Sequence, residues 1–94
     1  MKARLVEHEK TTDELGNTIE VTILEVPKSK DKPHGYKYSL VYIVHGARII
    51  CYDNAEGKGD HRHYASKEER YELKNIDKLF KDFYRDIRRF KNEG

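Results

Sequence analysis

The chain of 94 residues contains one cysteine, one methionine, two prolines and no tryptophan. The lone Cys51 excludes an intrachain disulfide and a zinc site built on cysteines. It lies in the apolar run 47–52, where a small buried side chain is a more frequent role than a reactive thiol. No apolar stretch approaches the roughly 18 residues of a membrane span, and no signal-peptide core follows Met1. We therefore expect a cytoplasmic protein with no membrane partner.

An excess of charge of one sign is also missing. Lysine and arginine total 19 against 17 aspartates and glutamates, which gives a formal net charge of +2. This balance excludes a strongly cationic nucleic-acid coat and a polybasic membrane tail, although it leaves a local basic patch open. The length indicates a single domain over residues 1–94, with one core between two layers.

What the sequence does contain is a series of runs in which apolar and polar residues alternate. In one of them Ile19, Val21 and Ile23 share a face, as in a strand with one buried side. The pair His45-Gly46 marks a tight turn between two further runs. Extended segments are predicted at 2–10, 18–26, 36–44 and 47–52, with a short additional strand at about 70–73.

The last segment predicts a helix over about 76–91. Asn75 precedes it as an N-cap, and its apolar residues recur at helical spacing: Ile76, Leu79, Phe80, Phe83, Tyr84, Ile87 and Phe90. The predicted fold class is therefore α+β, an antiparallel sheet of four to five strands, within about 2–73, with one C-terminal helix packed on one face. A doubly wound parallel fold would need several crossover helices.

Segment 52–64 has a density of ionisable residues and glycines that packing does not explain. It reads Tyr-Asp-Asn-Ala-Glu-Gly-Lys-Gly-Asp-His-Arg-His-Tyr. If 61–64 is extended, His61 and His63 point to one side, about 6.6 Å apart along the strand, and Asp60, Arg62 and Tyr64 point to the other.

One interpretation is a site that binds and cleaves an RNA phosphodiester without a metal. Such cleavage needs a base for the 2′-hydroxyl, an acid for the leaving 5′-oxygen and a cation for the charge on phosphorus. His61 and His63 are the candidate acid and base, and Asp60 would orient a histidine. Cations, glycines with accessible backbone N–H groups and stacking tyrosines would bind the substrate: Lys58, Arg62, Gly57, Gly59, Tyr64 and Tyr52.

Two other interpretations stay open. His61 and His63 could bind a metal together with Asp60, but the other histidines are scattered, so we assign no metal site and no cofactor. The segment is also explained as a solvated loop whose histidines pair with neighbouring carboxylates. The chain lacks a phosphate-binding P-loop, a dinucleotide-binding fingerprint, a serine nucleophile elbow and a His-Glu-x-x-His pattern.

The run 52–63, followed by an acidic stretch and by Leu-Phe-Lys-Asp-Phe-Tyr-Arg-Asp-Ile at 79–87, resembles the TumE-type toxin family. The resemblance covers most of the chain, including Tyr-Lys-Tyr at 36–38. It implies a growth-inhibiting protein of a prokaryotic toxin–antitoxin pair, neutralised by an antitoxin that is usually of the helix-turn-helix type. It assigns no catalytic residue.

Together these observations predict a toxin that acts on RNA as a metal-independent endoribonuclease. The alternative is a non-enzymatic module that inhibits by occupying RNA, a nucleotide or a protein, and a lesser alternative is a metal-assisted phosphodiester hydrolase. We expect a cognate antitoxin as partner, covering the histidine-rich loop or the open side of the sheet. Exposed sheet edges also favour a homodimer.

Overall fold

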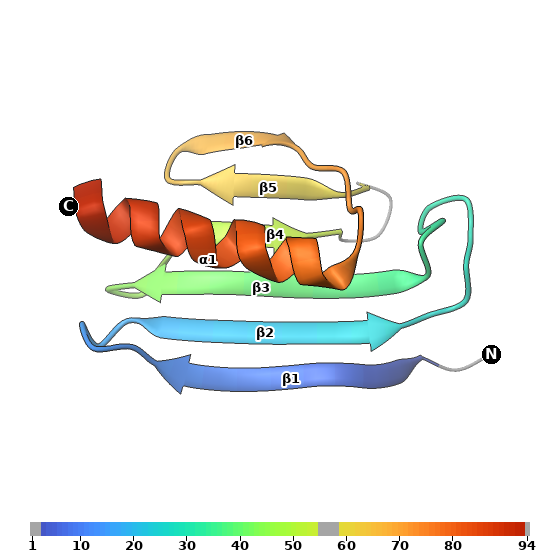
Figure 1. Ribbon diagram of the computed structural model, residues 1–94, viewed down its shortest axis with the longest axis horizontal. Helices are drawn as coiled ribbons and strands as arrows, with labels where there is room; N and C mark the ends of the chain where they lie inside the picture. The colour runs from blue at the N-terminus through green and yellow to red at the C-terminus, as the bar shows by residue number, and fades with distance from the viewer. Residues whose placement is uncertain (1–2, 55–58, 94) are drawn as a thin grey trace.

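The structure is a computed structural model that describes residues 3–54 and 59–93. In these residues, six strands precede one helix, and each strand pairs antiparallel with the next along the chain (Figure 1). The elements are β1 (Arg4–Thr12), β2 (Thr18–Glu25), β3 (Tyr36–Val44), β4 (Ala47–Asp53), β5 (His61–Tyr64), β6 (Lys67–Arg70) and α1 (Ile76–Glu93).

The α+β class and the C-terminal helix are confirmed. We expected four to five strands, and the part of the chain that the structure describes contains six. The difference is the hairpin β5–β6, whose second strand lies at Lys67–Arg70 and not at 70–73. These two strands read His-Arg-His-Tyr and Lys-Glu-Glu-Arg, so neither shows the alternation of apolar and polar residues that predicts a strand. Their positions depend on contacts with distant residues.

The helix α1 begins where its capping signal places it. The side chain of Asn75 accepts a hydrogen bond from the backbone N–H of Lys78 at 2.8 Å, which is the N-cap geometry. The helix ends at Glu93, two residues beyond the predicted end. Asp77 in its first turn and Lys91 in its last turn both complement the helix dipole.

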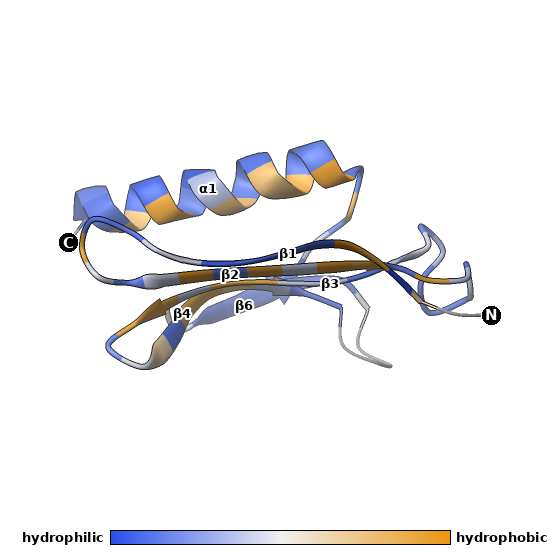
Figure 2. Cartoon of the chain, turned by 90° about the horizontal axis from the view of Figure 1, so that it is seen from below, coloured by the Kyte–Doolittle hydropathy of each residue, from blue (hydrophilic) through white to orange (hydrophobic). Residues whose placement is uncertain are grey.

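Alternation along the central strands builds the core on one side of the sheet. Figure 2 shows α1 above this side, with its apolar residues turned toward the strands and its polar residues turned outward. The buried apolar side chains are Val21, Ile23, Tyr38, Leu40, Tyr42, Ile50, Tyr52, Leu73, Leu79, Phe83 and Ile87. We call the covered side of the sheet the helix face and the opposite side the open face.

No helix among residues 3–54 and 59–93 combines the length and the apolar character needed to cross a membrane.

Candidate active site on the open face of the sheet

The strand register places both histidines of the motif on the open face. Arg62 contacts Asp86 of α1, so it points to the helix face, and its neighbours His61 and His63 point to the other side. Register partners in an antiparallel sheet carry their side chains on the same face. Two rows of side chains therefore cross the open face from β3 to β6: Ser39, Asp53, His61 and Arg70, and beside them Val41, Cys51, His63 and Glu68.

His61 has an acceptor oxygen at each ring nitrogen. Its Nε2 lies 2.9 Å from Oδ1 of Asp53, its partner on β4, and its Nδ1 lies 3.2 Å from the backbone oxygen of Gly59. The contact with Gly59 is a hydrogen bond, and the contact with Asp53 is an ion pair when the imidazole carries two protons. The side chain is 17% exposed, so it is held in place and still reachable from solvent.

His63 is in a different environment. It forms no hydrogen bond or ion pair with the residues that the structure describes, and its strand partners are Cys51 and Glu68. A histidine without a fixed partner can take up a proton from a bound substrate. Burial raises the pKa of the Cys51 thiol above its ordinary value, so this neighbour is the neutral thiol near neutral pH.

Two shallow hollows meet at His61. The first, of about 210 Å³, is lined by Arg48, Cys51, Asp53, His61, His63 and Glu68. The second, of about 350 Å³, is lined by Asp60, His61, Glu68, Glu69 and Arg70. His61 and Glu68 line both hollows, so they separate one basic side chain, Arg48, from another, Arg70.

Asp60 contacts a histidine, but that histidine is His34. Among the described residues, no hydrogen bond joins Asp60 to His61 or His63. Its Oδ1 is 3.1 Å from Nε2 of His34, and its Oδ2 accepts a hydrogen bond from the backbone N–H of Leu73 at 3.3 Å. Nδ1 of His34 accepts the backbone N–H of Tyr36 at 3.1 Å, so the Nε2 of His34 carries the proton toward Asp60. The carboxylate that orients His61 is therefore that of Asp53.

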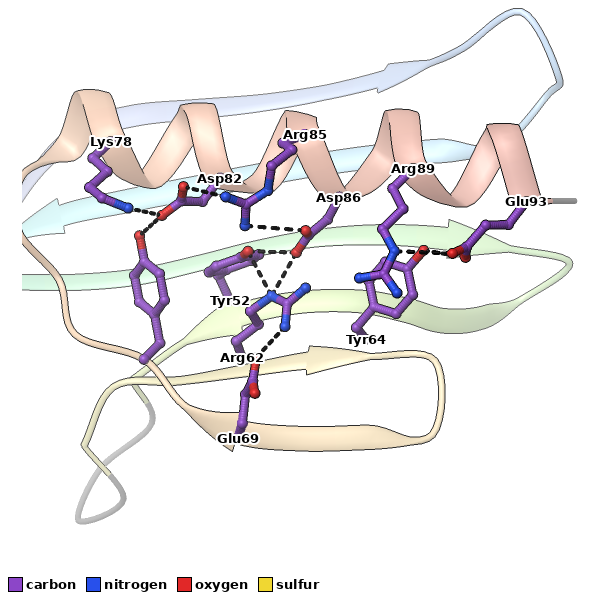
Figure 3. Close-up of polar contacts among 11 residues, drawn as sticks. Tyr52, Arg62, Tyr64, Glu69, Lys78, Asp82, Arg85, Asp86, Arg89 and Glu93 are labelled. Carbon is purple, nitrogen blue, oxygen red and sulfur yellow. Dashed lines mark hydrogen bonds and ion pairs between the residues drawn. The ribbon is translucent and has the colours of Figure 1, made fainter.

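Arg62 is held on the helix face by carboxylates. Figure 3 shows its guanidinium between α1 and β6. Its Nε donates to Oδ2 of Asp86 at 2.7 Å and to the hydroxyl of Tyr52 at 2.9 Å, and its Nη1 pairs with Glu69. The hydrogen bond with Asp86 raises the pKa of Arg62, although burial acts in the opposite direction. With its side chain 14% exposed, Arg62 would have to leave Asp86 to reach a phosphate on the open face.

The two tyrosines of the motif also point to the helix face. Tyr52 is wholly buried and donates to Oδ2 of Asp86 at 2.5 Å. Tyr64 donates to Oε1 of Glu93 at 2.8 Å, and the guanidinium of Arg89 lies 4.6 Å from its ring centre (Figure 3). Neither ring faces the histidine pair, so stacking on an RNA base would need these contacts with α1 to open.

Of the predicted phosphate-binding loop, only Gly59 lies in the described part of the chain. Its φ of 71° is in the left-handed region, where glycine carries no steric penalty, and its backbone oxygen holds His61. Gly57 and Lys58 lie outside the described residues, so their predicted contacts with phosphate remain predictions.

Sequence reasoning missed three residues at this site, which are Asp53, Arg48 and Arg70. Asp53 stands inside the motif, and a prediction of β5 paired with β4 would have placed it beside His61. Arg70 is the partner of His61 on β6, a strand that the sequence pattern does not reveal. Among residues 3–54 and 59–93, no three His, Cys, Asp or Glu side chains are grouped so as to hold a metal ion.

The family model described as Toxin TumE matches residues 2–91, nearly the whole chain. Among curated proteins and among solved structures, nothing matches.

Proposed function

The chain belongs to the TumE toxin family, and from this premise we propose that it is a toxin that cleaves RNA as a metal-independent endoribonuclease. Membership supports the toxin role, and a toxin in general implies an antitoxin partner. The RNA chemistry is our proposal. The observation that carries it is the pair His61 and His63 on one face of β5, with Asp53 at 2.9 Å from His61.

The proposed reaction needs one histidine as the acid and the other as the base. We assign the acid to His61, which has the Asp53 carboxylate and the Gly59 backbone oxygen at its ring nitrogens, and the base to His63. His63 takes the proton of a ribose 2′-hydroxyl, whose oxygen forms a bond to phosphorus. The bond from phosphorus to the 5′-oxygen breaks, and His61 protonates that oxygen. The products are a 2′,3′-cyclic phosphate and a 5′-hydroxyl.

Asp53 has a supporting part in this scheme. Its carboxylate fixes the ring of His61 and stabilises the positive charge that His61 carries before proton transfer. The leaving oxygen would take the place of one acceptor, and the longer contact, 3.2 Å to the Gly59 oxygen, is the easier one to give up. Asp53→Asn should therefore lower the cleavage rate with a smaller effect than loss of either histidine.

The test is incubation of purified protein with total RNA in EDTA, which removes divalent metals. We expect fragments ending in cyclic phosphate from the native protein and none from the His61→Ala/His63→Ala variant. His8→Ala is a matched control, because register partners connect His8 to His61 on the open face, four strands away. Equal cleavage by the native protein and the double variant, or no cleavage by either, would overturn the assignment.

A non-enzymatic alternative is favoured by the shallowness of the two hollows, which leaves the open face accessible to a large ligand. In that case the protein retains RNA without changing it, and inhibition comes from occupancy. RNA recovered intact from a stable complex would support this alternative, whereas a cleaved product excludes it. A metal-assisted hydrolase, the lesser alternative, would lose activity in EDTA and regain it with added metal.

We propose a helix-turn-helix antitoxin that covers the open face, since this would block the histidine pair directly. Co-purification followed by protection of His61 and His63 from diethyl pyrocarbonate would support this contact. The long strand β1 forms one edge of the sheet, and Leu5 and Val6 on it are exposed. An edge of this kind can pair with a second copy, so we propose a homodimer through β1, to be tested by light scattering of native protein and a Val6→Lys variant.

A further inference from the structure

The arginines of this chain fall into two groups according to their partners. All seven lie in the described residues, and four of them form ion pairs with carboxylates there: Arg4, Arg62, Arg85 and Arg89. The other three, Arg48, Arg70 and Arg88, are exposed and form no hydrogen bond or ion pair with a described residue. Such arginines bind an anion without first breaking an ion pair of this kind.

Two of these three arginines stand on opposite sides of His61. Arg48 lines the hollow that holds His63, and Arg70 lines the hollow on the other side of His61. Arg48 belongs to β4 and Arg70 to β6, so two strand spacings, about 9.6 Å, separate their strands. The two arginines are also offset along the strands, because Arg70 pairs with His61 whereas Arg48 lies near the opposite end of β4. The third, Arg88, lies on α1, which covers the opposite side of the sheet.

From this placement we infer that Arg48 and Arg70 bind two different phosphates of one extended single-stranded RNA, which crosses β4, β5 and β6 over His61. A guanidinium binds phosphate through paired N–H donors, and one arginine beside His61 also offsets the charge that develops on phosphorus. The inference rests on the proposed function, because it takes the phosphodiester at His61 as the reference point. It replaces Arg62 as the phosphate ligand, since Arg62 is bound to Asp86.

The shape and composition of the open face limit the substrate further. A mononucleotide carries its phosphates at one end and cannot reach two arginines on either side of His61. The tyrosines of β3, β4 and β5 all point to the helix face, so these strands offer no tyrosine ring for base stacking on the open face. Recognition through arginine and phosphate alone carries no sequence information, so we expect weak base preference and strong dependence on salt.

Glu68 gives the inference a second, opposite test. Its side chain lies between the two arginines and is 66% exposed. Its Oε2 is 3.9 Å from Nε2 of His61, which is a long contact for an ion pair. A carboxylate at this point repels a bound phosphate backbone. Replacing it by the uncharged Glu68→Gln should therefore tighten RNA binding, while most other substitutions on the open face weaken it.

The experiment measures binding of the full chain to a short fluorescent 2′-O-methyl oligoribonucleotide, which cannot be cleaved because its nucleophile is blocked. Arg48→Ala/Arg70→Ala should weaken binding by at least about tenfold per arginine. The slope of log affinity against log salt should become shallower by about 1.4, which is about 0.7 for each phosphate that an arginine no longer neutralises. Arg88→Ala removes the same charge from the other side of the molecule and should leave both the affinity and the salt slope unchanged. An excess of uridine monophosphate, added as competitor, should also leave them unchanged.

Each outcome separates this inference from the proposed function. If the double arginine variant and Arg88→Ala bind like native protein, or lose affinity equally, the two-arginine site is overturned, whatever the cleavage assay shows. If the native protein never cleaves RNA but the double variant alone loses affinity and slope, the site stands and the proposed chemistry falls. Melting temperatures of all variants are compared first, and because neither arginine pairs with a described residue, we expect them to match the native value.

Discussion

Asp86 of α1 and Arg62 of β5 form an ion pair across the core, with Oδ2 of Asp86 2.7 Å from Nε of Arg62 and only 2% of the Asp86 side chain exposed. Tyr52 donates to the same oxygen. The buried Asp86 and Tyr52 and the partly buried Arg62 thus meet at one contact, and this contact matters because an unpaired charge in a core is strongly destabilising. The contact attaches the polar hairpin β5–β6 to the helix.

Removal of the arginine tests this role. Arg62→Ala leaves the buried Asp86 with only the longer contact to Arg85, at 3.4 Å, so we expect the free energy of unfolding to fall by at most about 3–5 kcal/mol. Urea denaturation in the absence of RNA measures the change. Arg88→Ala, at an exposed position with no ion pair to a described residue, should stay within about 0.5 kcal/mol of the native value. Native stability of Arg62→Ala would contradict the structural role and favour Arg62 as a ligand of phosphate.

This ion pair also explains why the sequence predicts β2, β3 and β4 but not the hairpin β5–β6. The central strands bury alternate apolar side chains such as Val21 and Leu40, and this pattern is readable locally. β5 instead turns the partly buried Arg62 toward the helix, where it pairs with Asp86, 24 residues later. No local pattern in the sequence records a partner at that separation.

In the candidate site too, local features are predictable from the sequence and long-range pairings are not. Strand alternation alone places His61 and His63 on one side and Arg62 on the other, as the structure shows. The pairing of His61 with Asp53, and the position of Arg70 beside it, follow from the register of β4, β5 and β6. Register depends on turns and on tertiary packing, so these neighbours could not be chosen from the sequence.

The turn between β5 and β6 contains a backbone conformation that does not suit its residue. Ala65 has a φ of 53°, in the left-handed region, where a Cβ is unfavourable. We expect Ala65→Gly to raise the free energy of unfolding by about 0.5–1 kcal/mol. The same substitution in β4, Ala47→Gly, is the control and should lower stability, because φ is not positive there and glycine weakens strands. A loss of stability in both variants would contradict the prediction.

Cys51 lies beside His63 on the open face, and its chemistry can be tested separately. Burial raises the pKa of its thiol, so the thiolate is scarce near neutral pH and alkylation by iodoacetamide should be slow. The rate should rise to that of a free thiol when the protein is unfolded in urea. Cys51→Ala should retain the cleavage rate of the native protein, since no step of the proposed reaction uses sulfur. Loss of cleavage in a folded Cys51→Ala would instead assign the thiol a part in catalysis.

The turn between β1 and β2 makes stability depend on pH through Asp13. Burial of this carboxylate opposes its ionisation, but hydrogen bonds from Tyr42, Asn17 and Leu15 outweigh burial and lower its pKa from 3.8 to about 2. The contact with Tyr42 is the shortest of these, at 2.6 Å from hydroxyl to carboxylate. Because the pKa is lower in the folded state, ionised Asp13 stabilises the fold above pH 3.8, and this contribution disappears as the pH falls toward 2.

Melting temperatures of native protein and Asp13→Asn, recorded over this pH range, test the sign. The native protein should be the more stable one above the ordinary pKa of 3.8, and the difference should shrink steadily as the pH falls toward 2, because Asp13 becomes protonated there. Comparison with Asp13→Asn separates this group from the other carboxylates that titrate in the same range. Tyr42→Phe removes one hydrogen bond, so the carbon-13 resonance of the Asp13 carboxyl should then titrate at higher pH. A difference that stays constant with pH would contradict the assignment.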